Sequence, residues 1–165
     1  MSALLVGIGL TLLALVVEGL AATFAVEAMN ALLMRRMVGT GIWRNFFGTL
    51  LVLVILLTGH LTQVAAWAAA FMGVGEFDTF AVAFYHSAVN YTTLGYGDIV
   101  MSPRWRLLGP QEAVSGTLAF GWSTAAIVTV VIRLVRHRQR AGHIETPCRN
   151  CSRSFAKHSR APASS

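Results

Sequence analysis

The fold is decided by residues 80–98, which read Phe-Ala-Val-Ala-Phe-Tyr-His-Ser-Ala-Val-Asn-Tyr-Thr-Thr-Leu-Gly-Tyr-Gly-Asp. The apolar part, Phe80 to Tyr91, is about a dozen residues long, which is too short to cross the hydrocarbon of a bilayer as a helix. That length suits a re-entrant helix, which enters a membrane and leaves it on the same side. Gly95 and Gly97 then permit backbone conformations that other residues resist. The stretch therefore predicts a half-crossing helix followed by a specialised loop.

Three longer apolar segments surround this stretch, and each has the roughly 20 residues that a spanning helix needs. They run roughly from Ala3 to Leu33, between Arg44 and Glu76, and from Glu112 to Ile132. Overall, 55% of the residues are hydrophobic and 12% are charged. We predict an all-α membrane protein with three transmembrane helices and one re-entrant helix. In 165 residues we expect no separate catalytic or ligand-sensing domain, and without a nucleotide-binding loop we expect no enzyme.

Basic residues predict the orientation, because short loops rich in Lys and Arg stay on the cytoplasmic side. Arg35, Arg36 and Arg44 mark one such loop, and a tail from Arg133 to Arg160 marks another. Three crossings place both inside only if the amino terminus is extracytoplasmic, which also puts residues 73–110 outside. Arg104 and Arg106 depart from the rule but are offset by nearby acids, which are Glu76, Asp78, Asp98 and Glu112. We expect a multi-pass protein of the cell membrane.

The first segment has an alternative reading as a cleaved signal peptide, suggested by the small residues around Ala21 and Ala25. Signal peptides begin with positive charge, whereas nothing before Arg35 is basic and Glu18 lies inside the apolar run. An uncleaved helix fits better.

Residues 80–98 resemble the pore helix and selectivity filter of potassium channels. The family's filter pattern is matched throughout, with Leu94 where Val or Ile is usual, by Thr92, Thr93, Leu94, Gly95, Tyr96, Gly97 and Asp98. The resemblance implies that the carbonyls of residues 93–96, namely Thr93, Leu94, Gly95 and Tyr96, replace the water shell of potassium ions. It also implies that the Tyr96 side chain braces the filter from outside. Since one chain holds one such segment, a homotetramer is implied, with potassium as the permeant ion and no cofactor.

Around the filter, the resemblance assigns supporting roles to Tyr85, His86 and Val89. Tyr85 and His86 stand where an aromatic pair usually surrounds the filter, and His86 either donates to Tyr96 or is a wedged, neutral histidine. Val89 stands where some bacterial members carry a buried carboxylate, so we expect acid-based coupling of that kind to be missing. The helix itself is expected to be capped by Asp78-Thr79 and to direct its partly negative carboxyl end at the ions.

Residues 107–121, Leu-Leu-Gly-Pro-Gln-Glu-Ala-Val-Ser-Gly-Thr-Leu-Ala-Phe-Gly, are similar to the inner helices of bacterial two-helix potassium channels. Gly116 falls at the usual gating hinge, and the alternative is a small residue that permits close helix packing. Candidates for the gate lie further along, at Ala126, Thr129, Val130 and Arg133.

The resemblance covers roughly Asn45 to Val135 and divides the chain into three parts. Residues 1–44 form an extra helix, expected at the perimeter, and a cytoplasmic loop. Residues 45–136 form the pore domain, and residues 137–165 a basic tail, expected to be disordered and available to anionic lipids. Within the tail, Cys148 and Cys151 form a weak zinc motif with His143 and His158 nearby, and reduced free thiols are the alternative.

Glu18 is an ionisable residue deep in the bilayer, which is costly unless it is paired or protonated. At the helical rise, Glu18 and His60 of the antiparallel second helix lie at similar depths, about 18 and 21 Å from the inner boundary. We expect either a Glu18–His60 pair with Gln63 nearby, or a Glu18 that is neutral or faces another polar group.

The predicted function is passive, potassium-selective conduction through a tetrameric pore. The alternatives are a weakly selective cation channel of the same architecture and a non-conducting membrane scaffold. Voltage sensing is not expected, because no helix carries arginine at every third position.

Overall fold

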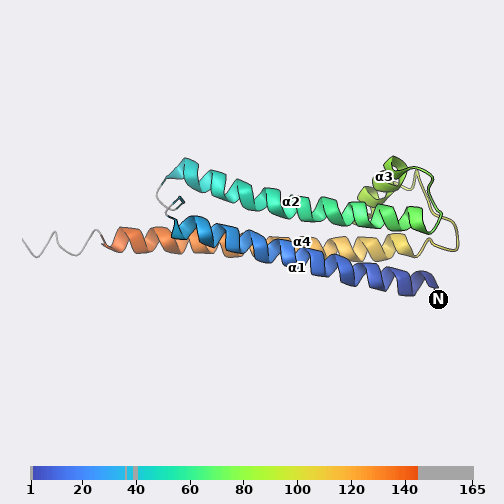
Figure 1. Ribbon diagram of the computed structural model, residues 1–165, viewed down its shortest axis with the longest axis horizontal. Helices are drawn as coiled ribbons and strands as arrows, with labels where there is room; N and C mark the ends of the chain where they lie inside the picture. Colours follow the sequence, from blue (N-terminus) through green and yellow to red (C-terminus); the bar gives the residue numbers. More distant parts are fainter. Residues whose placement is uncertain (1, 36, 39–40, 145–165) are drawn as a thin grey trace, which may run out of the picture.

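The computed structural model describes residues 2–35, 37–38 and 41–144. These residues form helices and connecting loops, with no strand among them. The helices are α1 (Ser2–Met34), α2 (Ile42–Gly73), α3 (Phe80–Tyr91) and α4 (Leu108–Ile144). Three long helices run side by side, and the short α3 lies at the same end of the bundle as the amino terminus (Figure 1).

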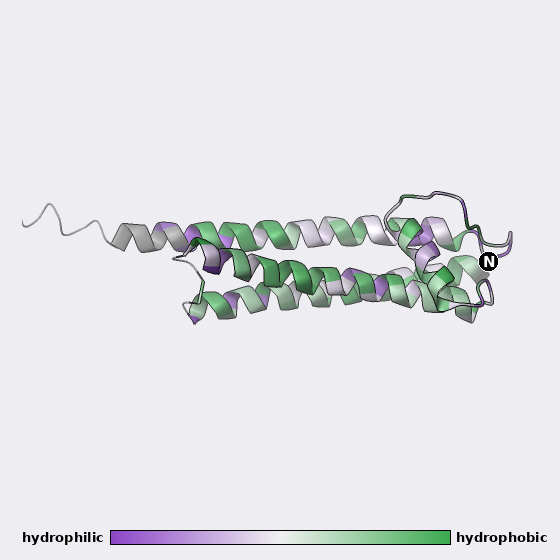
Figure 2. Ribbon diagram, turned by 90° about the horizontal axis from the view of Figure 1, so that it is seen from above, coloured by the Kyte–Doolittle hydropathy of each residue, from purple (hydrophilic) through white to green (hydrophobic). Residues whose placement is uncertain are grey.

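Three helices are long and apolar enough to span a membrane: Ala3–Met34, Ile42–Gly73 and Leu108–His137. Hydrophobic residues line much of their length (Figure 2), and large apolar side chains such as Leu13, Phe24 and Leu57 face outward. An outward apolar surface is expected where lipid is the solvent. Together with the half-length α3, this confirms the predicted all-α membrane fold.

The helix boundaries differ from prediction at three ends. α2 begins at Ile42 and therefore contains Arg44, α4 begins at Leu108 and not after Glu112, and α4 continues past Ile132 to Ile144. Charged side chains had been taken as boundaries, but they can extend to the membrane surface from within a helix. Pro110 does not delay the start of α4, because the first turn of a helix needs no backbone donor at that position.

α1 belongs to the core of the chain. Its most extensive contact is with α4 and its next with α2, while α2 and α4 touch each other much less. Apolar residues from all three helices share one cluster, including Met29 from α1, Leu56 from α2 and Val130 from α4. Whether α1 lies at the perimeter of an assembled pore stays a prediction.

α3 is held between α2 and α4 at the end of the bundle where α1 begins. Near its middle, the His86 ring packs against Phe71 of α2 and Phe77 of the preceding loop. At its carboxyl end, Tyr91 is buried with Val64 of α2 and Ala119 of α4. Both neighbours therefore fix where α3 ends, and with it the start of residues 92–98.

Candidate functional site

The site begins at the ends of α3, which the sequence located correctly. Thr79 is the residue that precedes the helix, in an extended conformation, but its side chain makes no capping hydrogen bond. At the other end Thr92 follows the last turn, and its hydroxyl donates to the Ala88 carbonyl at 2.7 Å. The capping prediction is therefore right in position, but the predicted side-chain contact is absent.

Residues 93–97 have a backbone in which every second residue lies in the left-handed region. The φ angles are 60° at Thr93, 58° at Gly95 and 73° at Gly97. Glycine adopts these angles freely, whereas in a β-branched residue such as threonine they are strained. In a regular strand successive carbonyls point to opposite sides, and left-handed residues at alternate positions interrupt that pattern. Gly95 and Gly97 therefore have the unusual conformations that the sequence led us to expect of them, and Thr93 shares them.

α3 anchors this segment at both ends. The Thr93 amide donates to the Asn90 carbonyl at 2.8 Å, and the Leu94 and Gly95 amides both donate to the Val89 carbonyl, at 3.0 and 3.2 Å. At the far end the Tyr85 hydroxyl donates to the Asp98 carboxylate at 2.8 Å. That bond raises the pKa of the Tyr85 hydroxyl. The segment is therefore hydrogen-bonded to α3 at both ends, through the amides of residues 93–95 at one end and through Asp98 at the other.

His86 has both of its ring nitrogens occupied within its own chain. Nδ1 lies 3.0 Å from the Ile99 carbonyl, and Nε2 lies 2.8 Å from the Asn90 side-chain nitrogen. A neutral ring that donates from Nδ1 and accepts at Nε2 satisfies both contacts. Burial lowers the pKa of His86, which also favours the neutral form. These contacts favour the wedged, neutral histidine over donation to Tyr96.

On a single chain, residues 92–98 are all exposed. Leu94 is 54% and Tyr96 is 67% exposed, which is unusual for residues in the middle of an ordered segment. Beside them lies an open hollow of about 420 Å³ that reaches from Gly95 and Gly97 to Val89 and Pro110. The segment is therefore positioned by α3 but not covered within the described part of one chain.

Glu112 of α4 is a buried acid next to α3 that sequence reasoning missed. It had been counted only as a charge in the outer loop, but it is 0% exposed. Its Oε1 and the Val64 carbonyl both lie within hydrogen-bond distance of the Ser87 hydroxyl, which is 2.8 Å from the carbonyl. Ser87 has a single hydrogen, so a protonated Glu112 that donates to Ser87 satisfies both contacts.

A periodic signal in the sequence would have revealed Glu112. Buried residues recur every three or four positions along α4, and they include Leu108, Glu112, Ser115, Ala119, Ser123, Ala126 and Val130. Most of them are small, so the face they form packs closely. An acid on such a face is buried. A carboxyl group does reach α3, but it comes from Glu112 of α4. That acid-based coupling is missing at Val89 stays a prediction.

Gly116 lies where α4 passes closest to the end of α3. A Cβ added there would be 2.1 Å from the Tyr91 carbonyl oxygen, which is backbone and cannot rotate away. A packing role therefore accounts for this glycine, and its role as a gating hinge stays a prediction. Nearer the other end of α4, the Arg133 guanidinium donates to the Asn30 side chain of α1.

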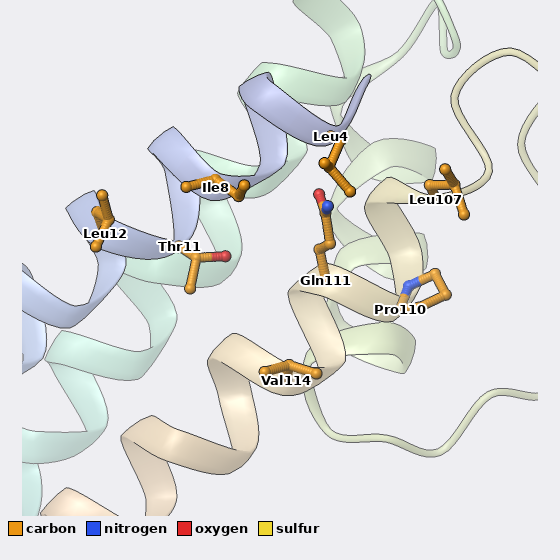
Figure 3. Close-up of a pocket in the computed structure, with 8 residues that line it drawn as sticks. All are labelled: Leu4, Ile8, Thr11, Leu12, Leu107, Pro110, Gln111 and Val114. Atoms are coloured by element: carbon orange, nitrogen blue, oxygen red, sulfur yellow. The ribbon is translucent and has the colours of Figure 1, made fainter. Parts of the chain in front are cut away.

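An apolar pocket of about 400 Å³ lies elsewhere, between the first turns of α1 and α4 (Figure 3). Leu4 and Ile8 of α1 face Pro110 and Val114 of α4 across it, and the Gln111 amide projects toward α1. The described residues contain no cluster of His, Cys, Asp and Glu that suits a metal ion. Cys148, Cys151 and His158 lie outside the described residues.

The half-length α3, the anchored loop and most of the two spanning helices on either side fall within one family match. Residues 50–133 match the family described as "Ion channel". The chain belongs to this ion channel family. The matched region includes most of α2, all of α3 and α4 as far as Arg133, whereas α1 precedes it. The protein is therefore a multi-pass membrane protein of an ion channel family. No solved structure matches the chain.

Proposed function

We propose that this ion channel is potassium-selective and passive, and that four identical chains form its pore. The observation that carries the proposal is the backbone of Thr93, Gly95 and Gly97, which is left-handed at alternate residues. The sequence Thr-Thr-Leu-Gly-Tyr-Gly-Asp at residues 92–98 supports potassium as the ion. Carbonyl oxygens of Thr93, Leu94, Gly95 and Tyr96 then replace the water shell of the ion.

The exposure of residues 92–98 supports the tetramer. A single strand offers oxygens from one side only, while a dehydrated ion must be surrounded. Leu94 and Tyr96 are more than half exposed on one chain, so neighbouring chains have apolar surface to cover. In this arrangement Asp98 is held by Tyr85 at the outer end, and the carboxyl end of α3 provides partial negative charge near the ions.

The proposed orientation places the amino terminus and residues 92–98 outside the cell. α1 begins at the end of the bundle where α3 lies, as this orientation requires (Figure 1). Arg133 and Arg136 then lie near the cytoplasmic surface, where anionic lipid headgroups attract basic residues.

The test is ion flux from liposomes that contain the purified full-length protein. We expect potassium to pass much faster than sodium, barium to block the flux, and Gly95→Ala to abolish it, because alanine resists a φ of 58°. Gly73→Ala is the matched control, since it lies at the end of α2 with nothing near its added Cβ.

Three results would contradict the proposal in different ways. Equal potassium and sodium fluxes would indicate a weakly selective cation channel. No flux in the wild type would indicate a non-conducting scaffold. Unchanged flux in Gly95→Ala would remove the filter assignment.

A further inference from the structure

A buried polar cluster joins all four helices next to the end of α3. Its members are Glu18 of α1, His60 and Gln63 of α2, Tyr91 of α3 and Ser123 of α4. Glu18 is 0% exposed and lies 3.7 Å from His60, so the expected Glu18–His60 contact is confirmed. Gln63 is also in contact, as expected, while Tyr91 and Ser123 had not been foreseen. Glu18 lies before the region that the ion channel family matches.

The contacts close into a ring. The Gln63 amide donates to Glu18 Oε2 at 2.8 Å, and the Tyr91 hydroxyl donates to Gln63 Oε1 at 3.1 Å. His60 Nδ1 lies 2.9 Å from the Tyr91 hydroxyl, and His60 Nε2 lies 3.0 Å from the Ser123 hydroxyl. The Ser123 hydroxyl contacts Glu18 Oε1 and completes the circuit. Gly59 permits the close approach of α1 to α2 here, since a Cβ at this position would lie 3.0 Å from the Ala21 Cβ.

Hydrogen atoms can be counted around the ring. It has five contacts and each needs one hydrogen. Gln63, Tyr91 and Ser123 supply one each, so Glu18 and His60 must supply the other two. A protonated Glu18 with a neutral His60 does so, and so does a Glu18 carboxylate with a doubly protonated His60. Both arrangements have zero net charge, and they differ by a proton that passes through the Ser123 hydroxyl.

Any other number of protons leaves the ring imperfect. With one fewer, a contact lacks its hydrogen and a negative charge is buried. With one more, a hydrogen lacks an acceptor and a positive charge is buried. The other carboxyl group that acts on Tyr91 is that of Glu112 in α4, which is bound to Ser87 and takes no part in the five contacts of the ring. The ring is therefore specific for one proton count.

We propose that Glu18 is a positioning residue for the pore, and that it holds the carboxyl end of α3 through this single-proton ring. Tyr91 is the last residue of α3. The amides of residues 93–95 donate hydrogen bonds to backbone carbonyls of the same last turn. A displaced Tyr91 therefore displaces the ion-binding segment. The inference rests on the proposed function only in identifying that segment as the filter.

The positioning role is tested by hydrogen–deuterium exchange on the full-length protein in lipid nanodiscs. We expect Glu18→Ala to speed exchange of the amides of residues 92–95 by about tenfold, because the last turn of α3 loses its support. Glu18→Gln offers an oxygen that accepts from Gln63 and an N–H that donates to Ser123, as the protonated acid does, so its exchange should match the wild type. Glu27→Gln is the control, since it makes the same change at an exposed position of α1.

In the Tyr91→Phe background, which removes the hydroxyl, Glu18→Ala should have no further effect on these amides. Wild-type exchange in Glu18→Ala, or equally fast exchange in Glu18→Gln, would overturn the positioning role.

The proton count is tested by moving the acid within the ring. Gln63→Glu alone adds a second carboxyl group, which must hold an extra proton for the ring to close. A carboxyl group ordinarily loses its proton at about pH 4, so holding that proton in the folded ring costs more as pH rises. The melting temperature of Gln63→Glu should therefore fall more steeply than that of the wild type between pH 6 and 9. The double substitution Glu18→Gln with Gln63→Glu restores the original count and should restore the wild-type profile. A double variant no better than Gln63→Glu would overturn the count.

These tests are separable from the proposed function. Exchange and melting do not require conduction, so a wild type without potassium flux removes the proposed function but leaves the ring to be judged. If potassium flux is present, Glu18→Ala should lower the potassium to sodium flux ratio by about tenfold, and Glu18→Gln should preserve it.

Discussion

Residues 92–98 and the Glu18 ring are neighbours, yet they differ in where their polar groups find partners. The ring closes within one chain, with Glu18 and Gln63 almost wholly buried. The segment at residues 92–98 is exposed throughout on one chain, although α3 anchors it. The difference teaches that one chain is sufficient to position the segment and insufficient to complete it. Four predictions test this division, and they follow in order of expected effect.

The largest effect is expected where the two regions meet, at Gly116. Gly116→Ala places a Cβ 2.1 Å from the Tyr91 carbonyl oxygen, so α3 and α4 must separate. We expect the free energy of unfolding to fall by about 2–3 kcal/mol, measured by melting of the purified protein. Gly121→Ala is the control, since nothing lies within 4 Å of its added Cβ and the change should stabilise α4 by up to about 1 kcal/mol.

A hinge role predicts a different outcome for the same variant. Wild-type melting of Gly116→Ala with altered channel opening would contradict the packing role and support the hinge.

The next effect concerns Glu112, whose contact with Ser87 is satisfied by a neutral acid. Glu112→Gln should change the free energy of unfolding by less than about 1 kcal/mol, because the amide can donate to Ser87 in the same way. Glu112→Ala should cost about 2 kcal/mol, since a cavity opens and the contact is lost. Melting at neutral pH distinguishes them, and equal losses in both variants would indicate that Glu112 is ionised.

A smaller effect is expected at the outer end of residues 92–98. Tyr85→Phe removes the hydrogen bond to Asp98, and an exposed bond of this kind contributes about 0.5–1.5 kcal/mol. We expect nearly unchanged melting but faster loss of potassium flux with time, as the end of the segment is released. Asp98→Asn keeps an acceptor oxygen for Tyr85, so its flux should decay more slowly than that of Tyr85→Phe. Identical decay of flux in wild type and Tyr85→Phe would show that residues 92–98 do not need this anchor.

The smallest effect is the pH dependence that His86 contributes. Burial lowers its pKa below the ordinary 6.5, so its stabilising contribution is complete above that value and is lost as pH falls through the lowered pKa. His86→Gln can donate to Ile99 and accept from Asn90 without titrating. Below pH 6 the melting temperature of the wild type should therefore fall relative to that of His86→Gln. A constant difference from pH 7 to 5 would contradict this.

Much of the fold could be predicted because a bilayer imposes lengths on its helices. Phe80–Tyr91 was located to the residue as an apolar run and recognised as re-entrant by its length, and three spans were found from the absence of charge. Unusual backbone conformations were expected at Gly95 and Gly97, because glycine adopts positive φ angles without steric cost. Thr93 shares that conformation, and its residue type gives no such indication.

Pairings between distant residues were harder to predict. The Glu18–His60 contact could be predicted from depth in the membrane, because the depth of a residue in either of two antiparallel helices follows from the helical rise. Ser123 could not be placed in that way, since which side of α4 faces α1 depends on the rotation of the helix. The same uncertainty hid Glu112, which was assigned to a loop because charge was treated as the end of a helix.

The ring also has a consequence for biosynthesis. Glu18 emerges from the ribosome early, whereas its partner Ser123 is made 105 residues later. Until then the acid has entered the translocation machinery without its complete set of partners, and a lone carboxylate in lipid is unfavourable. We therefore expect α1 to be stably packed only after α4 docks against it. Chains truncated before Ser123 should be degraded by cellular quality control.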